Sequence, residues 1–277
     1  MSTESADAPD VYVNHLRRRE LQPEMTKRQF DLVTEKALDF IEGRFDTMQK
    51  LDAVVKTNIN PFLMLAMAPA YNIFSPFEAA EYLQYAKMPH GDSTSFGRLV
   101  EEKIFPIFGV EIVEEKKTQK TKYSAIDGKL TVEGEDFLAT WKSGPWTMNQ
   151  SHANEMSANF PSIYQETGKR IILGIFYGVP SQMNNKPSLV RKNTDDYFEV
   201  LIGSELWEFV TGVRNAHMEV LRAFRQAQQE FSLKHGGKTF HEHMIESRLK
   251  LSQDFRTQFG LIGEDDDMWE ALFRHAF

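Results

Sequence analysis

Three residues in the middle of the chain have the types and the spacing that phosphodiester chemistry needs. Lys142 ends the apolar, β-favouring run 137–141, where a charged ammonium is unusual. Asp127 precedes this lysine by fifteen residues, and Glu155 follows it by thirteen. Two carboxylates can bind a hard divalent cation, which polarises a phosphoryl oxygen and lowers the pKa of a water molecule. A lysine beside them can stabilise or deprotonate an attacking water, so the set suits phosphodiester hydrolysis.

The elements expected around these residues would bring them together. Strands predicted over 129–133 and 136–142, separated by a Glu-Gly turn signal, would place Asp127 beside the strand end that carries Lys142. A helix expected from Thr147 to Ser157 would return Glu155 to the same end. Each residue also has an ordinary interpretation, because Asp-Gly commonly forms turns, strand ends often carry solvated lysines, and helical glutamates are often exposed.

The remaining pattern predicts an α/β fold of the mixed α+β kind, a sheet flanked by helices. A helix should begin at Thr26 and end near residue 58, and a second should begin with Ser75 as its N-cap. A third is expected from Ser93 to Phe105, stopping before a proline. Further strands are predicted over 109–117, 122–126, 170–178 and 197–203, with helices from residue 204 to the end.

This order of elements suggests three regions. Residues 1–92 form a helical region suited to dimerisation, 93–212 form the catalytic core, and 213–277 form helices that pack on the dimerisation region. Residues 1–10 are expected to be disordered because they are small, acidic and polar. The long amphipathic helices have more apolar surface than one sheet can cover, which favours a homodimer, although a simple helical subdomain would explain it nearly as well.

Composition narrows the class of protein. The chain has 277 residues and no cysteine, so disulfides and thiolate metal sites are excluded. Its net charge of −8 argues against a protein that coats nucleic acid, because contacts with phosphates need cations. Basic clusters at 17–19 and 116–122 leave room for a local nucleic-acid channel. The start lacks the features of a signal peptide, and no run reaches the roughly 20 apolar residues that span a bilayer. A cytoplasmic protein without a membrane partner is expected.

The arrangement of Asp127, then Thr140-Trp141-Lys142, then Glu155 resembles the PD-(D/E)XK nuclease superfamily. It is similar to the variant found in restriction enzymes that cut CCGG and CCNGG, where the second acid lies on the following helix. Further segments resemble the type II restriction endonucleases that cut RGGNCCY, in the same order, over about residues 55–215. These are "NINPF" (58–62), "HGDSTSFGRLVEEKIFP" (90–106), "WKSGPWT" (141–147), "ILGIFYG" (172–178) and "ELWEF" (205–209). The helices at either end show no visible match.

The resemblance implies roles for particular residues. Asp127 would be a metal ligand and Lys142 the catalytic lysine, with Mg²⁺ as the cofactor. Thr140 stands where the superfamily usually has an acid, so Glu155 would be the second catalytic acid and a metal ligand. Glu135 is the fallback for this second acid.

Two further positions follow from the same resemblance. Glu102 falls where related nucleases often keep an accessory metal ligand, although an exposed helical glutamate is an equal alternative. Pro145 departs from the basic residue expected there, which puts a phosphate contact at that position in doubt.

Candidate DNA contacts lie in two polar stretches. The segment 181–193 is predicted to be a loop whose Asn184 and Asn185 could pair with adenine and whose Arg191 or Lys192 could pair with guanine. An ordinary solvated loop is the alternative. The basic run that contains Lys120 and Lys122 suits phosphate contacts, which position the DNA without specifying its sequence. The histidines His235, His241 and His243 are not expected to bind zinc, because the last two face different sides of a predicted helix.

The resemblance therefore implies a Mg²⁺-dependent type II restriction endonuclease that acts on double-stranded DNA. A homodimer would cut a pseudopalindromic site with a GGNCC-like or CCNGG-like core and leave 5′ overhangs, beside a cognate methyltransferase. One alternative is a PD-(D/E)XK nuclease of repair or recombination without strict specificity. Others are a non-catalytic dimeric DNA-binding protein and a purely structural helical protein.

Overall fold

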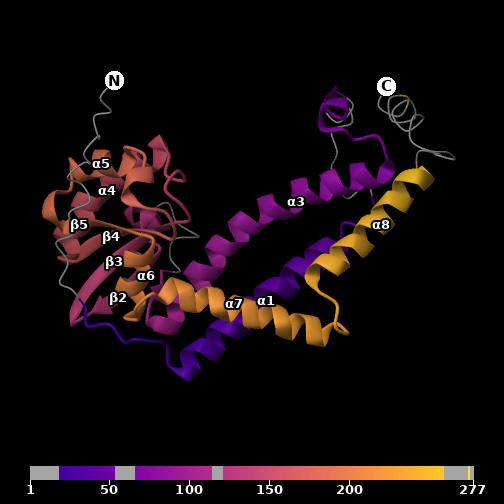
Figure 1. The fold of residues 1–277 in the computed structure, drawn as a ribbon. Coiled ribbons are helices and arrows are strands. Elements are labelled where there is room, and N and C mark those ends of the chain that lie inside the picture. Colours follow the sequence, from indigo (N-terminus) through magenta and orange to yellow (C-terminus); the bar gives the residue numbers. More distant parts are fainter. Residues whose placement is uncertain (1–18, 54–65, 114–120, 259–273, 275–277) are drawn as a thin grey trace, which may run out of the picture. The chain divides into compact units, whose positions relative to one another are not determined.

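The computed structural model describes residues 19–53, 66–113, 121–258 and 274 (Figure 1). The chain divides into two compact units, one made of residues 1–36 and 97–223 and the other of residues 37–96 and 224–277. The first unit contains the sheet, and the second is helical. No helix in the described ranges is long and apolar enough to cross a lipid bilayer.

The sheet unit includes a stretch of the N-terminal region that was expected to belong to a separate helical region. Gln22 forms a β-bridge with Val213, and its N–H donates to the carbonyl of Gly212 at 2.8 Å. The guanidinium of Arg19 donates to the carbonyls of Phe209 and Val210 at 2.9 and 3.0 Å. These bonds attach the segment before the first helix to the sheet unit.

Five strands form one mixed sheet in the order β1-β2-β3-β4-β5. Their bounds are Glu111–Ile112, Gly128–Val132, Glu135–Lys142, Arg170–Ile175 and Phe198–Ile202. The first three strands pair antiparallel, with Glu133 and Gly134 as the turn between β2 and β3, whereas β3, β4 and β5 are parallel. The mixed α/β fold is therefore confirmed, and the predicted strands at 129–133, 136–142, 170–178 and 197–203 are confirmed within a few residues.

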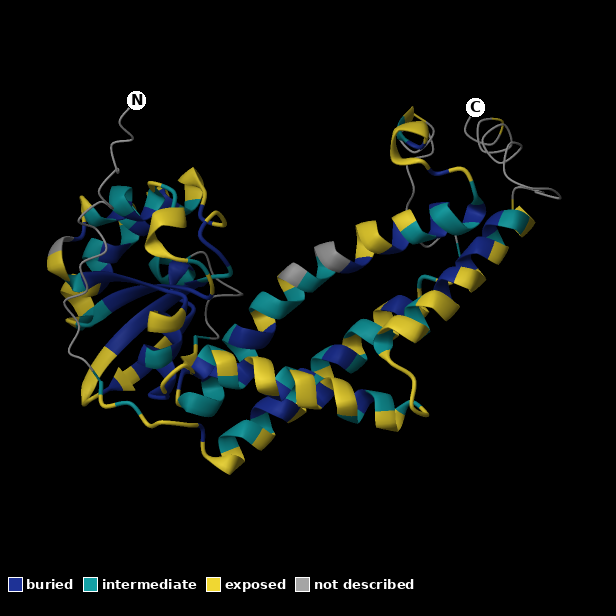
Figure 2. Cartoon of the chain, in the orientation of Figure 1, coloured by how far each residue is buried: buried dark blue, intermediate teal, exposed yellow. Residues whose placement is uncertain are grey.

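The two faces of the sheet are covered by different helices. Helix α4 (Gln150–Thr167) covers one face, and its buried residues Met156 and Phe160 pack in one core with Leu138 and Leu173. On the other face, Phe105 contacts Trp141 of β3 and Trp207 of α6 (Ser204–Thr211), with ring centroids 5.0 and 5.1 Å apart. Strands β4 and β5 are buried between these layers apart from Arg170, as are most residues of β3, and the buried parts of the sheet are dark blue in Figure 2. The parallel part of the sheet is thus covered on both faces, as is usual for parallel strands.

The alternation of side chains along β3 determines the face of the sheet to which Lys142 points. Side chains of successive strand residues point to opposite faces, so Leu138, Thr140 and Lys142 share the face that α4 covers. Because β3 and β4 are parallel and α4 connects them, the carboxyl end of β3 lies at the edge of the sheet where α4 begins. Lys142 is therefore placed under the first turns of α4.

The prediction of a strand at residues 122–126 is wrong. Residues 122–126 do not form a strand, because Lys122–Ala125 is a 3-10 helix. There Lys122 pairs with Glu166 of α4, and the hydroxyl of Tyr123 donates to the same carboxylate at 3.0 Å. These contacts with α4 outweigh the β-propensity of the segment.

No new helix begins at Ser93 either, because α3 runs from Pro76 to Leu99 without a break. It continues as a π-helix (Val100–Ile104) and a 3-10 helix (Phe105–Phe108) that includes the proline expected to stop it. The guanidinium of Arg44 lies across α3, donates to the carbonyl of Met88 at 3.1 Å and pairs with Asp92. Gly91 permits this approach, since a Cβ there would lie 2.9 Å from the guanidinium.

Helix α1 covers Lys27–Gln49, so it begins where expected and ends earlier than expected. Helices α7 (Ala216–Lys234) and α8 (Phe240–Gln258) lie in the region that was expected to be helical from residue 204. Helix α4 begins three residues after the predicted start and ends ten residues after the predicted end. Pro161 lies inside it, between the buried Phe160 and Ile163, so packing on the sheet offsets the lost backbone hydrogen bond.

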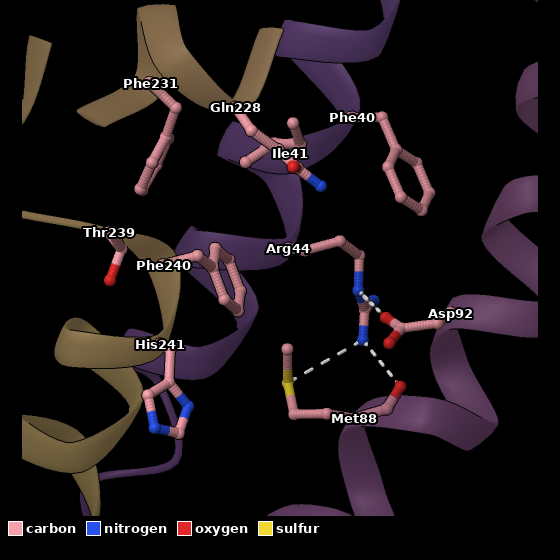
Figure 3. A pocket seen from close by; sticks show the side chains of 10 residues that line it. All are labelled: Phe40, Ile41, Arg44, Met88, Asp92, Gln228, Phe231, Thr239, Phe240 and His241. Carbon is pink, nitrogen blue, oxygen red and sulfur yellow. Dashed lines mark hydrogen bonds and ion pairs between the residues drawn. The ribbon is translucent and has the colours of Figure 1, made fainter. Parts of the chain in front are cut away.

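The helical unit has its own core and a cavity. Ala37, Ile41, Ala227 and Phe231 are buried together, and Nε2 of His235 lies 3.0 Å from the Glu42 carboxylate, which accepts a hydrogen bond from it. A cavity of about 450 Å³ lies among these helices, with aromatic rings around the Arg44–Asp92 ion pair (Figure 3). Its lining has no side chain in common with the sheet unit, so it is separate from the residues predicted to do chemistry.

Gly174 of β4 provides a test of the packing around β3. A Cβ at Gly174 would lie 2.6 Å from the Trp141 ring and 2.8 Å from Leu206. We expect Gly174→Ala to lower the free energy of unfolding by about 1–3 kcal/mol, because overpacking forces these side chains to move. Gly43→Ala is the control, since a Cβ there meets nothing within 4 Å on an exposed part of α1, and it should stabilise by about 0.5–1 kcal/mol. Urea unfolding of both variants checks this, and equal stability of the two would contradict it.

Candidate active site at the carboxyl edge of the sheet

Asp127 is bonded directly to the end of β3. Its Oδ2 accepts the backbone N–H of Trp141 at 2.7 Å and the hydroxyl of Thr140 at 2.9 Å, and its own N–H donates to the carbonyl of Ala139 at 2.7 Å. The residue is buried, with 4% of its surface exposed. The Asp-Gly pair therefore does not form a turn here, since Gly128 is the first residue of β2. Asp127 and Lys142 are brought to one strand end, as the sequence predicted.

Lys142 is the last residue of β3 and lies largely out of water. Burial lowers the pKa of its ammonium below the ordinary value, and attraction to the carboxylates of Glu101 and Glu155 offsets part of this shift. The ammonium is thus desolvated and has two carboxylates nearby. A lysine in this setting gives up its proton more readily than a solvated one.

Glu155 lies on α4 and faces the end of β3. The hydroxyl of Ser124 donates to its Oε1 at 2.5 Å, and its charge acts on Lys142. Helix α4 brings it there because Asn149 caps the first turn, its side chain accepting the N–H of His152 at 3.0 Å. The helix thus returns Glu155 to the strand end, as predicted.

The structure separates the fallback acid, Glu135, from this site. Glu135 is the first residue of β3 and Lys142 the last, so seven residues of extended strand, roughly 23 Å, lie between them. Glu135 is exposed and pairs with Arg170 at 3.7 Å. It therefore cannot complete a site at Lys142.

Of the two neighbouring acids in "VEEKI", Glu101 is the one whose charge acts on Lys142. Glu102 was predicted to be the accessory ligand, whereas the attractions that oppose the lowered pKa of Lys142 come from Glu101 and Glu155. Both lie in the π-helix that follows α3. Its wider turn shifts the phase of the side chains, so the 3.6-residue period of α3 does not predict which acid faces the sheet.

Three residues near Lys142 were not identified from the sequence. Burial lowers the pKa of His152, and the charge of Lys142 lowers it further, while Glu155 opposes the shift. Its position three residues before Glu155 on α4 was an available signal, because such residues share a helix face. Ser124 and Glu101 come from segments distant in sequence, and no local pattern identifies them.

The carboxylates at this edge fit Mg²⁺ by their chemistry. Within the described ranges, no three histidine, aspartate or glutamate side chains already gather closely enough to hold a metal ion. Mg²⁺ does not need such a cage, because it keeps several waters and is usually bound by one or two carboxylates and the phosphates of a substrate. Asp127 is bonded to the residue beside Lys142, and Glu155 and Glu101 act on Lys142 itself, so this set provides the required oxygens.

The prediction that residues 181–193 form a loop is wrong. Residues 180–182 form a 3-10 helix, and Lys186–Arg191 form the short helix α5, with Pro187 in its first turn. Asn184 supports this helix, because its side chain accepts the Lys186 N–H at 2.9 Å and donates to the Met148 carbonyl at 3.0 Å. Its amide group therefore already makes two hydrogen bonds within the protein.

The other predicted DNA contacts are placed as follows. Asn185 and Lys192 are exposed at the two ends of α5, and Arg191 is partly buried in its last turn. Lys122 is paired with Glu166 at the far end of α4 from Glu155. Lys120 lies outside the described residues.

The chain matches the model of a known protein family. A family model described as Type II restriction endonuclease EcoO109I matches residues 28–232. This range covers the whole sheet and every residue placed around Lys142. No curated protein matches the chain significantly.

The lowered pKa of Lys142 predicts how stability depends on pH. The unfolded chain holds this proton more tightly than the folded protein, so the lysine weakens the fold until the pH approaches its ordinary pKa of 10.5. We expect Lys142→Met to raise the free energy of unfolding by on the order of 1 kcal/mol at neutral pH, and by less as the pH rises toward that value. Urea unfolding at neutral pH and at about pH 9.5 measures this.

Lys129→Met is the matched control, because Lys129 is an exposed lysine on the neighbouring strand β2. It should show no such pH-dependent gain. A Lys142→Met protein that is less stable than the native one at neutral pH would contradict the assignment of a desolvated ammonium.

Proposed function

Because the chain belongs to the family of the type II restriction endonuclease EcoO109I, we propose that it hydrolyses phosphodiester bonds of double-stranded DNA at a specific sequence, at the edge of the sheet where Lys142 ends β3. The observation that carries this proposal is the bonding of Asp127 to the backbone beside Lys142, with Glu155 brought to the same place by α4. An aspartate, a lysine and a helical glutamate then form a site of the PD-(D/E)XK kind.

Each residue of this site has a role that follows from its setting. Lys142 lies where a phosphate would enter, and its ammonium neutralises charge that develops on a non-bridging oxygen. Its lowered pKa also lets it exchange a proton with an attacking water. Asp127 and Glu155 would hold Mg²⁺, with Glu101 as the accessory acid. When bound, the ion supplies Lewis-acid polarisation of the phosphoryl group.

Hydrogen bonds orient the two acids before substrate arrives. Asp127 is immobilised by β3, and Ser124 fixes one oxygen of Glu155. Because these bonds exist in the folded protein without DNA, the carboxylates need little reorganisation when a phosphate binds. Asp127 is also a structural residue, so its removal would leave the buried N–H of Trp141 without an acceptor.

The finer proposals concern the DNA and the assembly. We propose a site with a GGNCC-like or CCNGG-like core, cut to leave 5′ overhangs, in a cytoplasm where a cognate methyltransferase protects it. A pseudopalindromic site calls for a two-fold dimer, in which each copy cuts one strand. Exposed apolar side chains on the helical unit support a dimer through that unit, notably Leu233 at 79% exposure and Leu249 at 56%.

Cleavage of phage DNA tests the site residue by residue. We expect discrete fragments with Mg²⁺ and none without a divalent ion. Lys142→Ala and Glu155→Gln should lower the rate by about 10²–10³-fold or more, because each removes a charge that acts on the transition state. Glu101→Gln should cost about 10–100-fold as an outer ligand.

Glu135→Gln and Glu102→Gln are the matched controls and should cut at nearly the native rate. Asp127→Asn is preferred to Asp127→Ala, since it keeps an acceptor for the Trp141 N–H. A smear in place of discrete bands would indicate a nuclease without strict specificity. DNA binding without any cleavage, whatever the divalent ion, would leave a DNA-binding protein and refute the nuclease.

The oligomeric state gives a separate test. We expect sedimentation to give twice the chain mass of 32.0 kDa, and Leu233→Glu with Leu249→Glu to shift the protein toward the monomer by burying charge in the interface. Gln229→Glu, at an exposed polar position of α7, should leave the mass unchanged. A native protein that sediments as a monomer at all concentrations, with and without DNA, would refute the dimer.

A further inference from the structure

An exposed tryptophan lies a few residues beyond Lys142. Trp146 has 71% of its surface exposed, whereas Trp141 and Trp207 are 4% and 5% exposed. Tryptophan carries a large apolar surface, so leaving most of it in water gives up the free energy that burial would provide. The described residues of the sheet unit leave most of this side chain uncovered, so burial in their core does not explain its position.

A closed turn holds Trp146 in this place. The N–H of Thr147 donates to the carbonyl of Gly144 at 3.2 Å, and its hydroxyl donates to the same carbonyl at 2.7 Å. The N–H of Gly144 in turn donates to that hydroxyl at 3.4 Å. Pro145 and Trp146 are the two central residues of this turn, and proline fixes one backbone dihedral there. The indole is thus presented to solvent by a stiff loop.

A second exposed aromatic residue borders the same loop. Tyr177 is 62% exposed, and its ring lies against Gly144, where an added Cβ would meet the ring at 2.4 Å. The residue before it, Phe176, is fixed from both sides. Its N–H donates to the carbonyl of Lys142 at 3.0 Å, and its carbonyl accepts the Trp207 indole N–H at 2.8 Å.

The distances along the chain place both rings close to the catalytic lysine. Lys142 pairs with Ile175 in the sheet, so Tyr177 follows that position by about 7 Å of extended chain. Trp146 follows Lys142 by four residues, which reach at most about 14 Å. Successive nucleotides of a DNA strand rise 3.4 Å along the helix axis. A phosphate at Lys142 therefore brings its neighbouring nucleotides over these rings.

We propose that Trp146 and Tyr177 form an aromatic platform that contacts the bases and sugars of the cleaved DNA strand beside the scissile phosphate. This inference rests on the proposed function and adds to it residues that position the DNA. Aromatic rings beside a phosphate site stack on bases or wedge between base steps. The occupant is DNA because the rings flank the residue that must meet a phosphate and are carried by the two loops that leave adjacent strands there.

The experiment uses the full-length Lys142→Ala protein, which should bind DNA without cutting it. The probe is a duplex that spans a cleavage position mapped with the native protein, beside a scrambled duplex of the same composition. Acrylamide quenching of tryptophan fluorescence reports exposure of the indole. The difference between this protein and the same protein with Trp146→Phe isolates the signal of Trp146.

We expect the duplex to shield Trp146 from acrylamide, more strongly for the mapped site than for the scrambled one. Trp146→Ala should raise the Kd of the duplex by about 10-fold or more, in line with the loss of a stacked base, while Trp146→Phe keeps most of the affinity. The melting temperature should stay at the native value, because the side chain is mostly in water. Leu221→Ala is the control, at a 53% exposed apolar position of α7 in the same unit, and should not change the Kd.

The outcomes separate the inference from the proposed function. If the duplex binds but Trp146 stays equally quenchable and Trp146→Ala binds as tightly as its parent, the aromatic platform is wrong and the nuclease stands. If the indole becomes shielded as protein concentration rises without DNA, a second copy of the chain covers it, and the inference is overturned. If the native protein neither binds nor cuts duplex DNA, the proposed function fails and the inference fails with it.

Discussion

The hydrogen bonds from β3 to the carboxylate of Asp127 are the constraint on which the candidate site depends. One oxygen of this buried acid accepts both the Trp141 N–H and the Thr140 hydroxyl. The acid cannot leave its place without exposing a buried N–H that has no other acceptor. Since Trp141 and Lys142 are adjacent, the same bonds set the distance between acid and lysine.

The pleat of β3 then determines which helix can complete the site. Trp141 points to the face covered by Phe105 and α6, and Lys142 points to the face covered by α4. On that side, α4 brings Glu155 toward the ammonium, and the segment before β2 holds Asp127 beside the strand end. A shift of one residue in the β3 register would turn the lysine to the other face, away from Glu155.

The buried lysine is costly for folding and useful for chemistry. Its lowered pKa means that the folded protein holds the charge less favourably than water does. Sites of this kind are often less stable than the same fold with an apolar residue in place of the charge. The desolvation that weakens the fold also strengthens the interaction of the ammonium with a phosphate.

The sequence predicted the strands because their signals are local. Apolar runs bounded by turn residues mark β2, β3, β4 and β5, and the resemblance identified Asp127, Lys142 and Glu155. It failed where tertiary contacts decide, as at Lys122–Ala125, where bonds to Glu166 give a 3-10 helix. It also did not single out Glu101 near Lys142, because the π-helix changes the phase of the side chains.

Trp146 shows a third kind of limit. The segment that contains it, residues 141–147, supported the family resemblance. An aromatic residue in a sequence is nevertheless expected by default to be buried. Only the closed turn and the exposed fraction of the indole distinguish it from Trp141, five residues earlier.

Localised oxidative cleavage of the protein tests the central claim most directly. With Fe²⁺ in place of Mg²⁺ on the Lys142→Ala protein bound to duplex DNA, ascorbate and peroxide cut the backbone next to the bound ion. The account predicts cuts near residues 101, 127 and 155, lost when Glu155→Gln is added. Cuts near Glu135 or in the helical unit, unchanged by Glu155→Gln, would contradict a metal site at the end of β3.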